Sequence, residues 1–327
     1  MTMNPTIKVR DVAYPRLQAP DLDAMEAFLL DFGMVRAERT TDTLYMRGCG
    51  TAPYVHVVHV GEPGFRGFAF EAVSRDDLDR VAALDGFTPV RPLGAPGGGW
   101  FTSTRDPNGI AVEVVFGIER VAPLADGAPR RLNMGTSVQR VGVLQRVQSG
   151  PSRIRRFGHL ALNVPDVRTT LDWYRARFGL IESDVVSLAH GLPLAVFTRC
   201  DRGAEPADHH TILFAGSLGG AGAASLNHLS WEVVDLDDIH AGNEFLQARG
   251  RHHEWGIGRH LLGSQVFDYW RDPWGHIHEH WTDGDQLDAS VPAGEVTPDA
   301  ALSSQWGPNP PPTFGRTIAP GAAMARS

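Results

Sequence analysis

The sequence has few cysteines, no long apolar run and no recognisable leader. Only two of its 327 residues are cysteine, Cys49 and Cys200, and they lie far apart, so two free thiols in a reducing compartment are favoured over a disulfide framework. No run of about 18 apolar residues occurs, so no membrane span is expected. The opening segment MTMNPTIKVRD lacks the apolar core of a signal peptide. These absences predict a cytoplasmic protein that does not bind a membrane.

Basic clusters are also lacking. The formal net charge is −8, and no basic run is longer than a pair such as Arg155-Arg156, which argues against a nucleic-acid partner. The hydrophobic content of 42% and the charged content of 21% are typical of a packed globular protein. The length is sufficient for two domains of ordinary size.

The sequence repeats itself between its two halves. Residues 13–34 align with residues 158–180, and both segments read as a short apolar strand, a Pro-Asp pair, an amphipathic helix and a Phe-Gly pair. Asp21 and Asp166 are expected to be helix N-caps, because a short side-chain oxygen can accept a hydrogen bond from a free N–H of the first turn. The repeat therefore predicts the same local structure at both places.

The repeat continues through each half. Residues 67–81 match residues 228–242, and residues 105–114 match residues 271–280. The tetrapeptides DPNG and DPWG inside the last pair predict tight turns between two strands. Each half thus contains two units of about fifty residues, and each unit reads as a strand, a helix and several further strands.

The composition places boundaries between these parts. We expect an N-terminal domain without metal over 8–120, a connection over 121–153 and a C-terminal catalytic domain over 154–285. Residues 286–327 are rich in Pro, Gly and Ala, and they predict an extended tail that either wraps around the body or is partly disordered.

Three residues of the second half predict a metal site: His159, His228 and Glu279. The two histidines open the first strands of the two units, and Glu279 lies on the last strand of the second unit. Two imidazoles and one carboxylate on one side of a metal leave the opposite positions open. The equivalent positions of the first half are Tyr14, Gly67 and Glu113, so both imidazoles are lost there. Because a lone carboxylate does not hold a transition metal, we expect one metal per chain, in the second half. Twelve of the 14 histidines lie between residues 159 and 280.

Three further histidines lie beside Glu279 in the sequence, namely His276, His278 and His280. Side chains alternate between the two faces of a strand, so these three are expected on the face opposite Glu279 and not as ligands.

The segment GIGRHLLGSQVFDYWRDPWGHIHEHWTDGD (256–285) carries a family resemblance. Its Gly-x-Gly-Arg-His run ends at His260, Tyr269 follows after nine residues, and Glu279 follows after ten more. In this pattern, and in the order His, His, Glu, the chain resembles the type I extradiol ring-cleavage dioxygenases of the vicinal oxygen chelate superfamily over roughly residues 10–283. A further active-site histidine of that family matches the run Asp-His-His-Thr at 208–211, where the alignment favours His209 over His210.

The resemblance implies an α+β fold of four βαβββ units. The units are paired into two domains, each of which curls a mixed sheet around a funnel, and the N-terminal funnel is structural. It also implies a homo-oligomer, since many members form dimers or larger assemblies.

The resemblance implies ring opening of a small aromatic diol of the catechol type by O₂, beside the two hydroxyls, to a semialdehyde or keto acid. Fe(II) is the expected metal, and Mn(II) is an alternative because oxygen and imidazole ligands suit both ions. His209 is expected to donate a proton during oxygen chemistry. His260 and Tyr269 are expected to bind the substrate oxygens, although a purely structural hydrogen bond would also account for His260.

Trp255 and Trp270 flank the predicted site and, with His210, are candidate substrate contacts. Their rings favour a flat, apolar aromatic substrate over a highly charged one. Two other functions of the superfamily stay open. One is a glyoxalase-like isomerase or a hydrolase, which commonly needs a fourth protein ligand to the metal. The other is an antibiotic-sequestering protein, which is typically a single domain without the three ligands.

Overall fold

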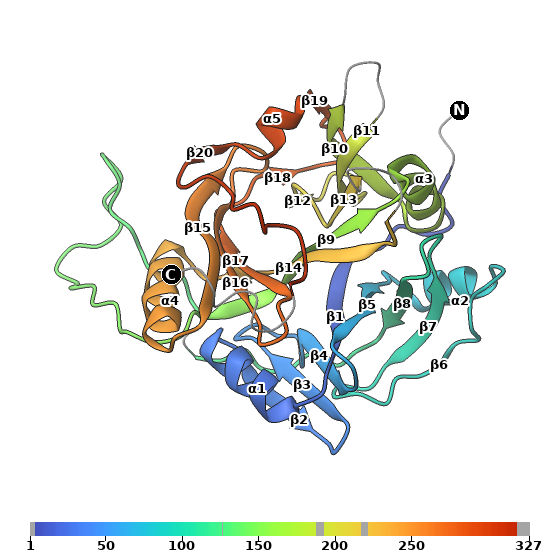
Figure 1. Ribbon diagram of the computed structural model, residues 1–327, viewed down its shortest axis with the longest axis horizontal. Coiled ribbons are helices and arrows are strands. Elements are labelled where there is room, and N and C mark those ends of the chain that lie inside the picture. The colour runs from blue at the N-terminus through green and yellow to red at the C-terminus, as the bar shows by residue number, and fades with distance from the viewer. Residues whose placement is uncertain (1–3, 126, 188–192, 217–221, 319–327) are drawn as a thin grey trace.

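The structure is a computed structural model that describes residues 4–125, 127–187, 193–216 and 222–318. Two large curled sheets lie beside each other, with a few helices packed around them (Figure 1). None of the described helices is both long and apolar enough to span a membrane.

The first half forms an eight-stranded sheet in the order β2-β3-β4-β1-β5-β8-β7-β6. Two helices accompany it, α1 (Leu22–Asp31) and α2 (Arg75–Ala82). The strands are β1 (Asp11–Ala19), β2 (Val35–Arg39), β3 (Thr43–Arg47), β4 (His56–Val60), β5 (Gly64–Glu71), β6 (Arg91–Pro92), β7 (Trp100–Arg105) and β8 (Ala111–Phe116).

The second half forms a ten-stranded sheet in the order β19-β10-β11-β13-β9-β14-β17-β16-β15-β20. Its helices are α3 (Val167–Phe178) and α4 (Leu236–Ala248). The strands before the tail are β9 (Ile154–Val164), β10 (Leu180–Ser187), β11 (Pro193–Cys200), β12 (Ala207–Asp208), β13 (Ile212–Gly216), β14 (Ser225–Val233), β15 (His252–His260), β16 (Val266–Arg271) and β17 (Ile277–Thr282); β12 pairs outside the main sheet.

Each half is built from two copies of one unit. In every copy the first strand is followed by a helix and three strands of the main sheet, and the first and last strands of the copy pair in parallel. The first strands of the two copies in a half, β1 and β5 or β9 and β14, pair antiparallel. The predicted α+β fold of βαβββ units is therefore confirmed, whereas the residue boundaries at 120, 153 and 285 stay a prediction.

The capping and turn signals act as predicted. The side chain of Asp21 accepts hydrogen bonds from two first-turn N–H groups of α1, and Asp166 accepts one from the backbone N–H of Thr169 in α3. The DPNG and DPWG turns connect β7 to β8 and β16 to β17. In each turn an aspartate, Asp106 or Asp272, accepts backbone N–H groups of the turn through its side chain.

Helix α1 of the first half packs against the back of the second sheet. The ring of Phe32 stacks on His280 with centroids 3.8 Å apart, and Phe28 and Phe32 meet the edge of His278. The Nε2–H of His280 donates a 2.7 Å hydrogen bond to the backbone oxygen of Phe32. The back of the second sheet is therefore covered by a helix of the first half.

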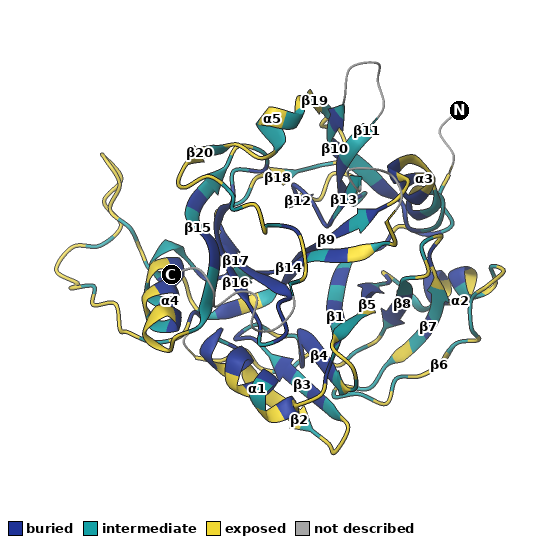
Figure 2. Cartoon of the chain, in the orientation of Figure 1, coloured by how far each residue is buried: buried dark blue, intermediate teal, exposed yellow. Residues whose placement is uncertain are grey.

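Helix α3 of the second half makes the reciprocal contact. Its Tyr174 packs against Phe68 and Phe70 of β5, and its hydroxyl donates to Asp106 at 3.1 Å. The apolar side chains of both halves consequently form one continuous core. Figure 2 shows buried residues concentrated in the central strands of both sheets. The two halves therefore stabilise each other, since each buried aromatic side chain contributes about 1.5–3 kcal/mol through its apolar surface.

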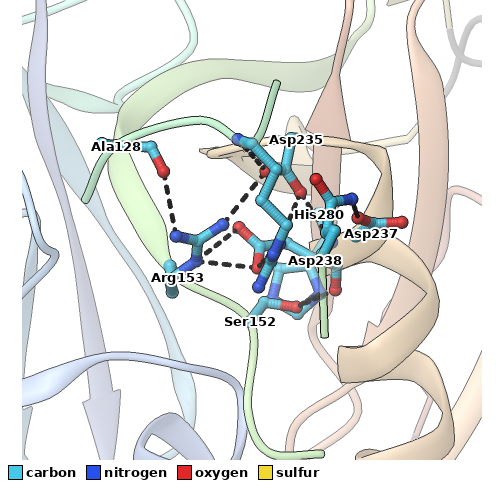
Figure 3. Close-up of polar contacts among 9 residues, drawn as sticks. Ala128, Ser152, Arg153, Asp235, Asp237, Asp238 and His280 are labelled. Atoms are coloured by element: carbon cyan, nitrogen blue, oxygen red, sulfur yellow. Dashed lines mark hydrogen bonds and ion pairs between the residues drawn. The ribbon is translucent and has the colours of Figure 1, made fainter. Parts of the chain in front are cut away.

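The connection between the halves is joined to helix α4 by a polar cluster (Figure 3). Arg153 forms ion pairs with Asp235, the N-cap of α4, and with Asp238, and it also donates to the backbone oxygen of Ala128. The hydroxyl of Ser152 donates to the backbone oxygen of Asp238 at 2.9 Å. These contacts set the chain direction just before β9, the strand that carries His159.

The tail packs along the second half. It forms β18 (Gln286–Leu287), β19 (Gly294–Val296), α5 (Pro298–Ala301) and β20 (Ser304–Trp306). β19 joins β10 at one edge of the main sheet and β20 joins β15 at the other. Of the two expected alternatives, wrapping around the body therefore holds for residues 286–318, while residues 319–327 lie outside the described part.

Candidate functional site

The predicted metal ligands lie together inside the second funnel. The ligand atoms of His159 on β9, His228 on β14 and Glu279 on β17 all fall within 4.8 Å of one another. His159 Nε2 is 3.0 Å from Glu279 Oε2, and His228 Nε2 is 3.7 Å from the same oxygen. Donor atoms held at about 2.1 Å and at right angles around one ion are roughly 3 Å apart, so this spacing fits one transition metal. All three side chains are buried.

Two neighbouring side chains orient these groups. Asn227 Oδ1 lies 2.9 Å from His228 Nδ1, so it accepts that N–H and leaves the lone pair of Nε2 for the site. The hydroxyl of Ser230 donates to Glu279 Oε2 at 2.5 Å. The sequence analysis missed both residues, although Ser230 lies two positions after His228 and could have been found from strand alternation.

Burial and neighbouring groups shift the pKa values of two of the three candidate ligands. Burial lowers the pKa of His228 to about 3, which keeps the imidazole neutral. Burial alone would raise the pKa of Glu279, but charge attraction and hydrogen bonding from His159 hold it well below its ordinary value. His228 Nε2 and Glu279 Oε1 are buried without a hydrogen-bond partner among the described residues. Unpaired buried acceptors are costly, and a cation would satisfy both.

The first half has the same backbone frame but different chemistry. In the first sheet, Tyr14 pairs with Ala69 and Ala69 pairs with Glu113. In the second sheet, His159 pairs with Ser230 and Ser230 pairs with Glu279 in the same way. In the first half, Glu113 accepts a 2.9 Å hydrogen bond from the Tyr14 hydroxyl and forms an ion pair with the Arg16 guanidinium. The position equivalent to His228 is Gly67, at φ +132°, where a Cβ would lie 2.1 Å from the backbone oxygen of Ala111.

The structure places His210, and not His209, against the three ligands. The ring centroid of His210 is 4.1 Å from that of His159, and its side chain lines the cavity. His209 lies behind it: its Nε2 is 2.7 Å from Asp184 Oδ2 and its Nδ1 is 3.1 Å from His210 Nδ1. The sequence alignment favoured His209, whereas the structure places His210 in the cavity wall, because successive residues point to opposite sides of an extended chain.

His260 and Tyr269 lie beside the three ligands as the family spacing predicts. The Tyr269 hydroxyl is 2.8 Å from His260 Nε2, and both side chains line the cavity. Burial, with the nearby charge of Glu279, raises the pKa of Tyr269 well above its ordinary value. Tyr269 is therefore a hydroxyl donor at neutral pH, and His260 Nε2 can accept its proton.

The two tryptophans fall on opposite sides of the sheet. Trp255 lines the cavity and stacks parallel to Tyr269 with centroids 5.3 Å apart. Trp270 is buried on the other face, where its Nε1–H donates to Asp268 at 2.7 Å and its ring meets His253. Trp270, a candidate substrate contact from the sequence, therefore does not line this cavity, because the neighbouring residue Tyr269 does and a strand alternates its side chains.

The cavity is small and mainly apolar. Its volume is about 60 Å³. None of its lining residues is Asp, Glu, Lys or Arg; besides the groups already described they are Phe197, Leu213, Leu262, Gln265, Ala301, Leu302 and Phe314. Benzene occupies an engineered cavity of about 150 Å³, so a catechol would need some of these side chains to move.

Three of these wall residues, which the sequence analysis missed, come from the tail. The Phe314 ring lies 4.7 Å from Trp255, 4.9 Å from Tyr269 and 6.0 Å from His228, measured between centroids. Hydrogen bonds to the backbone on both sides of Phe314 hold the ring in place, because Arg271 donates to the backbone oxygens of Thr313 and Arg316. No spacing rule connects Phe314 to the ligands, so only the folded chain reveals it.

The histidines beside Glu279 face away from the cavity, as predicted. His276 and His278 both bond to the carboxylate of Asp272, at 2.9 and 3.3 Å. His280 packs on Phe32, as described above.

Known proteins are similar to this chain in sequence and in fold. Residues 156–279, which contain all three candidate ligands, match the profile of the glyoxalase/bleomycin resistance protein/dioxygenase superfamily. Metapyrocatechase 2 of Cupriavidus necator is 30% identical over 318 residues, which covers 95% of this chain and 93% of that protein.

Solved structures share the fold along almost the whole chain. The Mn(II)-bound glyoxalase of Novosphingobium aromaticivorans superposes with a TM-score of 0.76 at 22% identity, covering 97% of both chains. Homoprotocatechuate 2,3-dioxygenase of Brevibacterium fuscum, in its complex with 3,4-dihydroxyphenylacetate, gives 0.76 at 18% identity and covers 94% of this chain and 92% of that one. With the full-length similarity to metapyrocatechase 2, the chain belongs to the extradiol catecholic dioxygenases of the glyoxalase/bleomycin resistance protein/dioxygenase superfamily.

Proposed function

We propose that this protein opens an apolar catechol beside its two hydroxyls with O₂, using one Fe(II) held by His159, His228 and Glu279. The observation that carries the proposal is the three-ligand cluster, whose His228 lines a cavity together with the polar side chains of His210, His260, Gln265 and Tyr269. The products would be a ring-opened semialdehyde or keto acid.

The donor set suits this ion. Two imidazole nitrogens and one carboxylate oxygen match the facial arrangement of non-haem Fe(II) enzymes, and Mn(II) accepts the same donors. When bound, the metal supplies adjacent positions at which a diol and O₂ meet and through which electrons pass from the ring to oxygen. The described residues place no fourth His, Cys, Asp or Glu in this cluster, so the remaining positions are left to small molecules.

His210 is our candidate for moving protons at the oxygen side of the substrate. Asp184 accepts the Nε2–H of His209, which leaves His209 Nδ1 to accept from His210 Nδ1–H. This order of hydrogen bonds leaves the lone pair of His210 Nε2 for the cavity. We therefore assign to His210 the proton-transfer role, and to His209 and Asp184 the role of orienting its ring.

His260 and Tyr269 are our candidates for binding the diol. Tyr269 can hold a substrate oxygen through its hydroxyl, and His260, 2.8 Å from that hydroxyl, can accept the proton that the diol releases on binding. Their positions on β15 and β16, two paired strands, keep this geometry rigid.

The walls select the substrate. A catechol carrying a carboxylate would find no cationic side chain among the lining residues, whereas an alkyl or aryl substituent would lie against Phe314, Trp255 and Leu302. We propose that the tail residues Leu302 and Phe314 move aside when the ring enters, since the cavity is otherwise too small.

The test is anaerobic reconstitution with Fe(II) or Mn(II), metal analysis, and an oxygen electrode with catechol, 4-methylcatechol, 2,3-dihydroxybiphenyl and 3,4-dihydroxyphenylacetate. We expect one metal per chain, O₂ uptake equal to the diol consumed, a yellow product, and faster turnover of the uncharged diols. Silence toward the whole series, together with conversion of a glutathione hemithioacetal, would instead support a glyoxalase-like isomerase. Stoichiometric binding of an antibiotic by the metal-free protein would support the sequestering function.

We also propose that the protein is a homo-oligomer and that the arm formed by residues 129–148 contacts a second copy. The arm projects from the body (Figure 1), and Val141 and Leu144 on it are 83% and 76% exposed. The arm carries Arg130, Arg131, Arg140 and Arg146 and no acidic residue, whereas the chain has a net charge of −8. An apolar, basic arm complements an acidic copy of the same protein.

Light scattering after size-exclusion chromatography tests this proposal. We expect an oligomer that dissociates in the Val141→Asp/Leu144→Asp double variant but not in the control Val73→Asp, which alters another half-exposed valine outside the arm. A wild-type monomer, or an unchanged mass in the double variant, would refute the arm interface.

A further inference from the structure

A cavity of about 700 Å³ lies beside Glu113, and it is lined by residues of the first half and by Trp173 and Arg177 of α3. Its lining includes Phe101 and Ser103 of β7, and Ser103 pairs with Glu113 as Tyr269 pairs with Glu279 in the second half. In register, the part of the cavity wall formed by Ser103 and Glu113 is therefore equivalent to Tyr269 and Glu279 of the second sheet. Its volume is within the range of about 300–1,000 Å³ that is usual for small-molecule sites.

The lining of this cavity is strongly basic. Two acidic residues, Asp85 and Glu113, are outnumbered by five arginines: Arg16, Arg66, Arg91, Arg105 and Arg177. Five positive charges less two negative ones leave three in excess, in a chain whose net charge is −8. Glu113 is already paired with Arg16 and Tyr14, so it does not neutralise the other arginines.

Two of the guanidinium groups are held in place by aromatic rings. Arg91 lies over Phe101, 4.8 Å from the ring centroid, and Arg177 lies over Trp173 at 4.6 Å. Stacking fixes a guanidinium plane. Arg177 also donates from Nη1 to the backbone oxygen of Trp173 at 3.4 Å. The Nε of Arg177 is buried without a hydrogen-bond partner in the part of the chain that the structure describes. A buried donor without a partner is costly, and an acceptor in the cavity would satisfy it.

We propose that this cavity binds a small organic oxyanion, a carboxylate or a phosphate ester, in contact with Arg91 and Arg177. Guanidinium forks match both groups with paired N–H···O bonds. The hydroxyls of Thr88 and Ser103 lie in the same wall and can add hydrogen bonds. The proposal does not depend on the reaction assigned to the other funnel, although the expected ring-opened product is itself a carboxylate.

The experiment is isothermal titration calorimetry on the full-length protein at low ionic strength. The probes are inorganic phosphate, glycerol 3-phosphate, glutarate and the product formed from catechol by the protein itself. We expect saturable binding of at least one probe at one site per chain. The affinity should fall at least ten-fold in the Arg91→Gln/Arg177→Gln double variant.

The control variant is Arg75→Gln. Arg75 also stacks on an aromatic ring, lying 4.6 Å from the centroid of Trp100, but it does not line the cavity. Its substitution should leave binding unchanged. If the double variant does not fold, Arg66→Gln/Arg91→Gln replaces it, because both side chains are exposed.

The choice among the probes distinguishes a phosphate site from a carboxylate site. No saturable binding of any probe, or equal affinity in the wild type and the folded double variant, would overturn the proposal. Loss of O₂ uptake in the Glu279→Gln variant with oxyanion binding intact would show that the two sites are separate.

Discussion

Glu113 and Glu279 occupy the same register position in two copies of one fold, yet their surroundings differ. Around Glu279 lie two imidazoles, His159 and His228. Around Glu113 lie the hydroxyl of Tyr14 and the guanidinium of Arg16. A buried carboxylate needs a compensating positive charge. The protein side chain Arg16 supplies that charge in the first half, whereas in the second half we propose a metal.

The comparison extends to the neighbouring strand. Arg16 pairs with Val57 in the first half as Ala161 pairs with Leu213 in the second. Tyr54 lies three residues before Val57, and His210 lies three residues before Leu213. The Tyr54 ring contacts Tyr14 at 4.8 Å, as the His210 ring contacts His159 at 4.1 Å. A change of side chains on a common backbone therefore gives the two funnels different chemistry.

The largest expected effect comes from removing one carboxylate at a time. Glu279→Gln should abolish metal binding and lower kcat/KM for a catechol by about a thousand-fold or more, since even outer-sphere partners of a metal contribute about 10- to 100-fold. Glu113→Gln, the equivalent change in the first half, should keep one metal per chain and most of the activity. Metal content and O₂ uptake measure both variants. Equal loss in the two variants would contradict the assignment of the metal to the second funnel.

The second comparison concerns the adjacent histidines. His210→Phe should retain the metal and lose about 100-fold or more in kcat, because general acid–base groups contribute at least that much. His209→Phe should lose only about ten-fold, since His209 acts through the orientation of His210. Steady-state kinetics on metal-replete protein decide between them. A larger loss for His209→Phe would restore the original sequence-based preference.

The third comparison removes the positive charge that compensates Glu113 in the first half. Arg16→Met should lower the free energy of unfolding by about 2 kcal/mol, less than for a fully buried pair because a quarter of the Arg16 side chain is exposed. The Arg16→Met/Glu113→Gln double variant should recover most of this loss, since no buried charge is then left unpaired. Denaturant unfolding of the three variants measures the effect. Strictly additive losses would show that the pair does not interact.

A smaller effect on stability is expected from acidic pH, through two buried histidines. Burial lowers the pKa of His280 to about 3 and that of His56 well below its ordinary value of 6.5. Below pH 6.5 the unfolded chain therefore binds protons that the folded chain does not, and the free energy of unfolding falls as pH falls, by at most about 1.4 kcal/mol per residue per pH unit. Unfolding curves at pH 7.5 and 5.5 should show a smaller pH effect in His280→Gln than in the wild type. An unchanged pH effect would exclude His280 as a contributor.

The smallest effect is expected at the wall that the tail contributes. Phe314→Ala should enlarge the cavity and raise kcat/KM for 2,3-dihydroxybiphenyl relative to catechol by a few-fold, or roughly 1 kcal/mol of discrimination. Competition between the two diols in one assay measures this ratio directly. A ratio equal to that of the wild type would mean that Phe314 does not contact the substituent.

Much of this protein follows from local sequence signals. The cap residues Asp21 and Asp166, the turns at DPNG and DPWG and the strand alternation around Glu279 depend on neighbours within a few residues, and they appear as predicted. The repeat also specified which residues would meet: His159, His228 and Glu279 are far apart in the chain, but each occupies a defined position in a unit whose strands pair in a fixed register.

Other features depend on contacts that no local signal encodes. The local path of the chain before β13 decides which of two adjacent histidines faces the cavity. Trp270 lies outside the cavity wall because Tyr269 occupies the inner face of the same strand. The tail residue Phe314, the reciprocal packing of α1 and α3, and the basic cavity arise from segments brought together over long sequence separations. Sequence periodicity determines the faces of each strand, whereas the packing of distant segments against those faces is determined only when the whole chain buries its apolar surface.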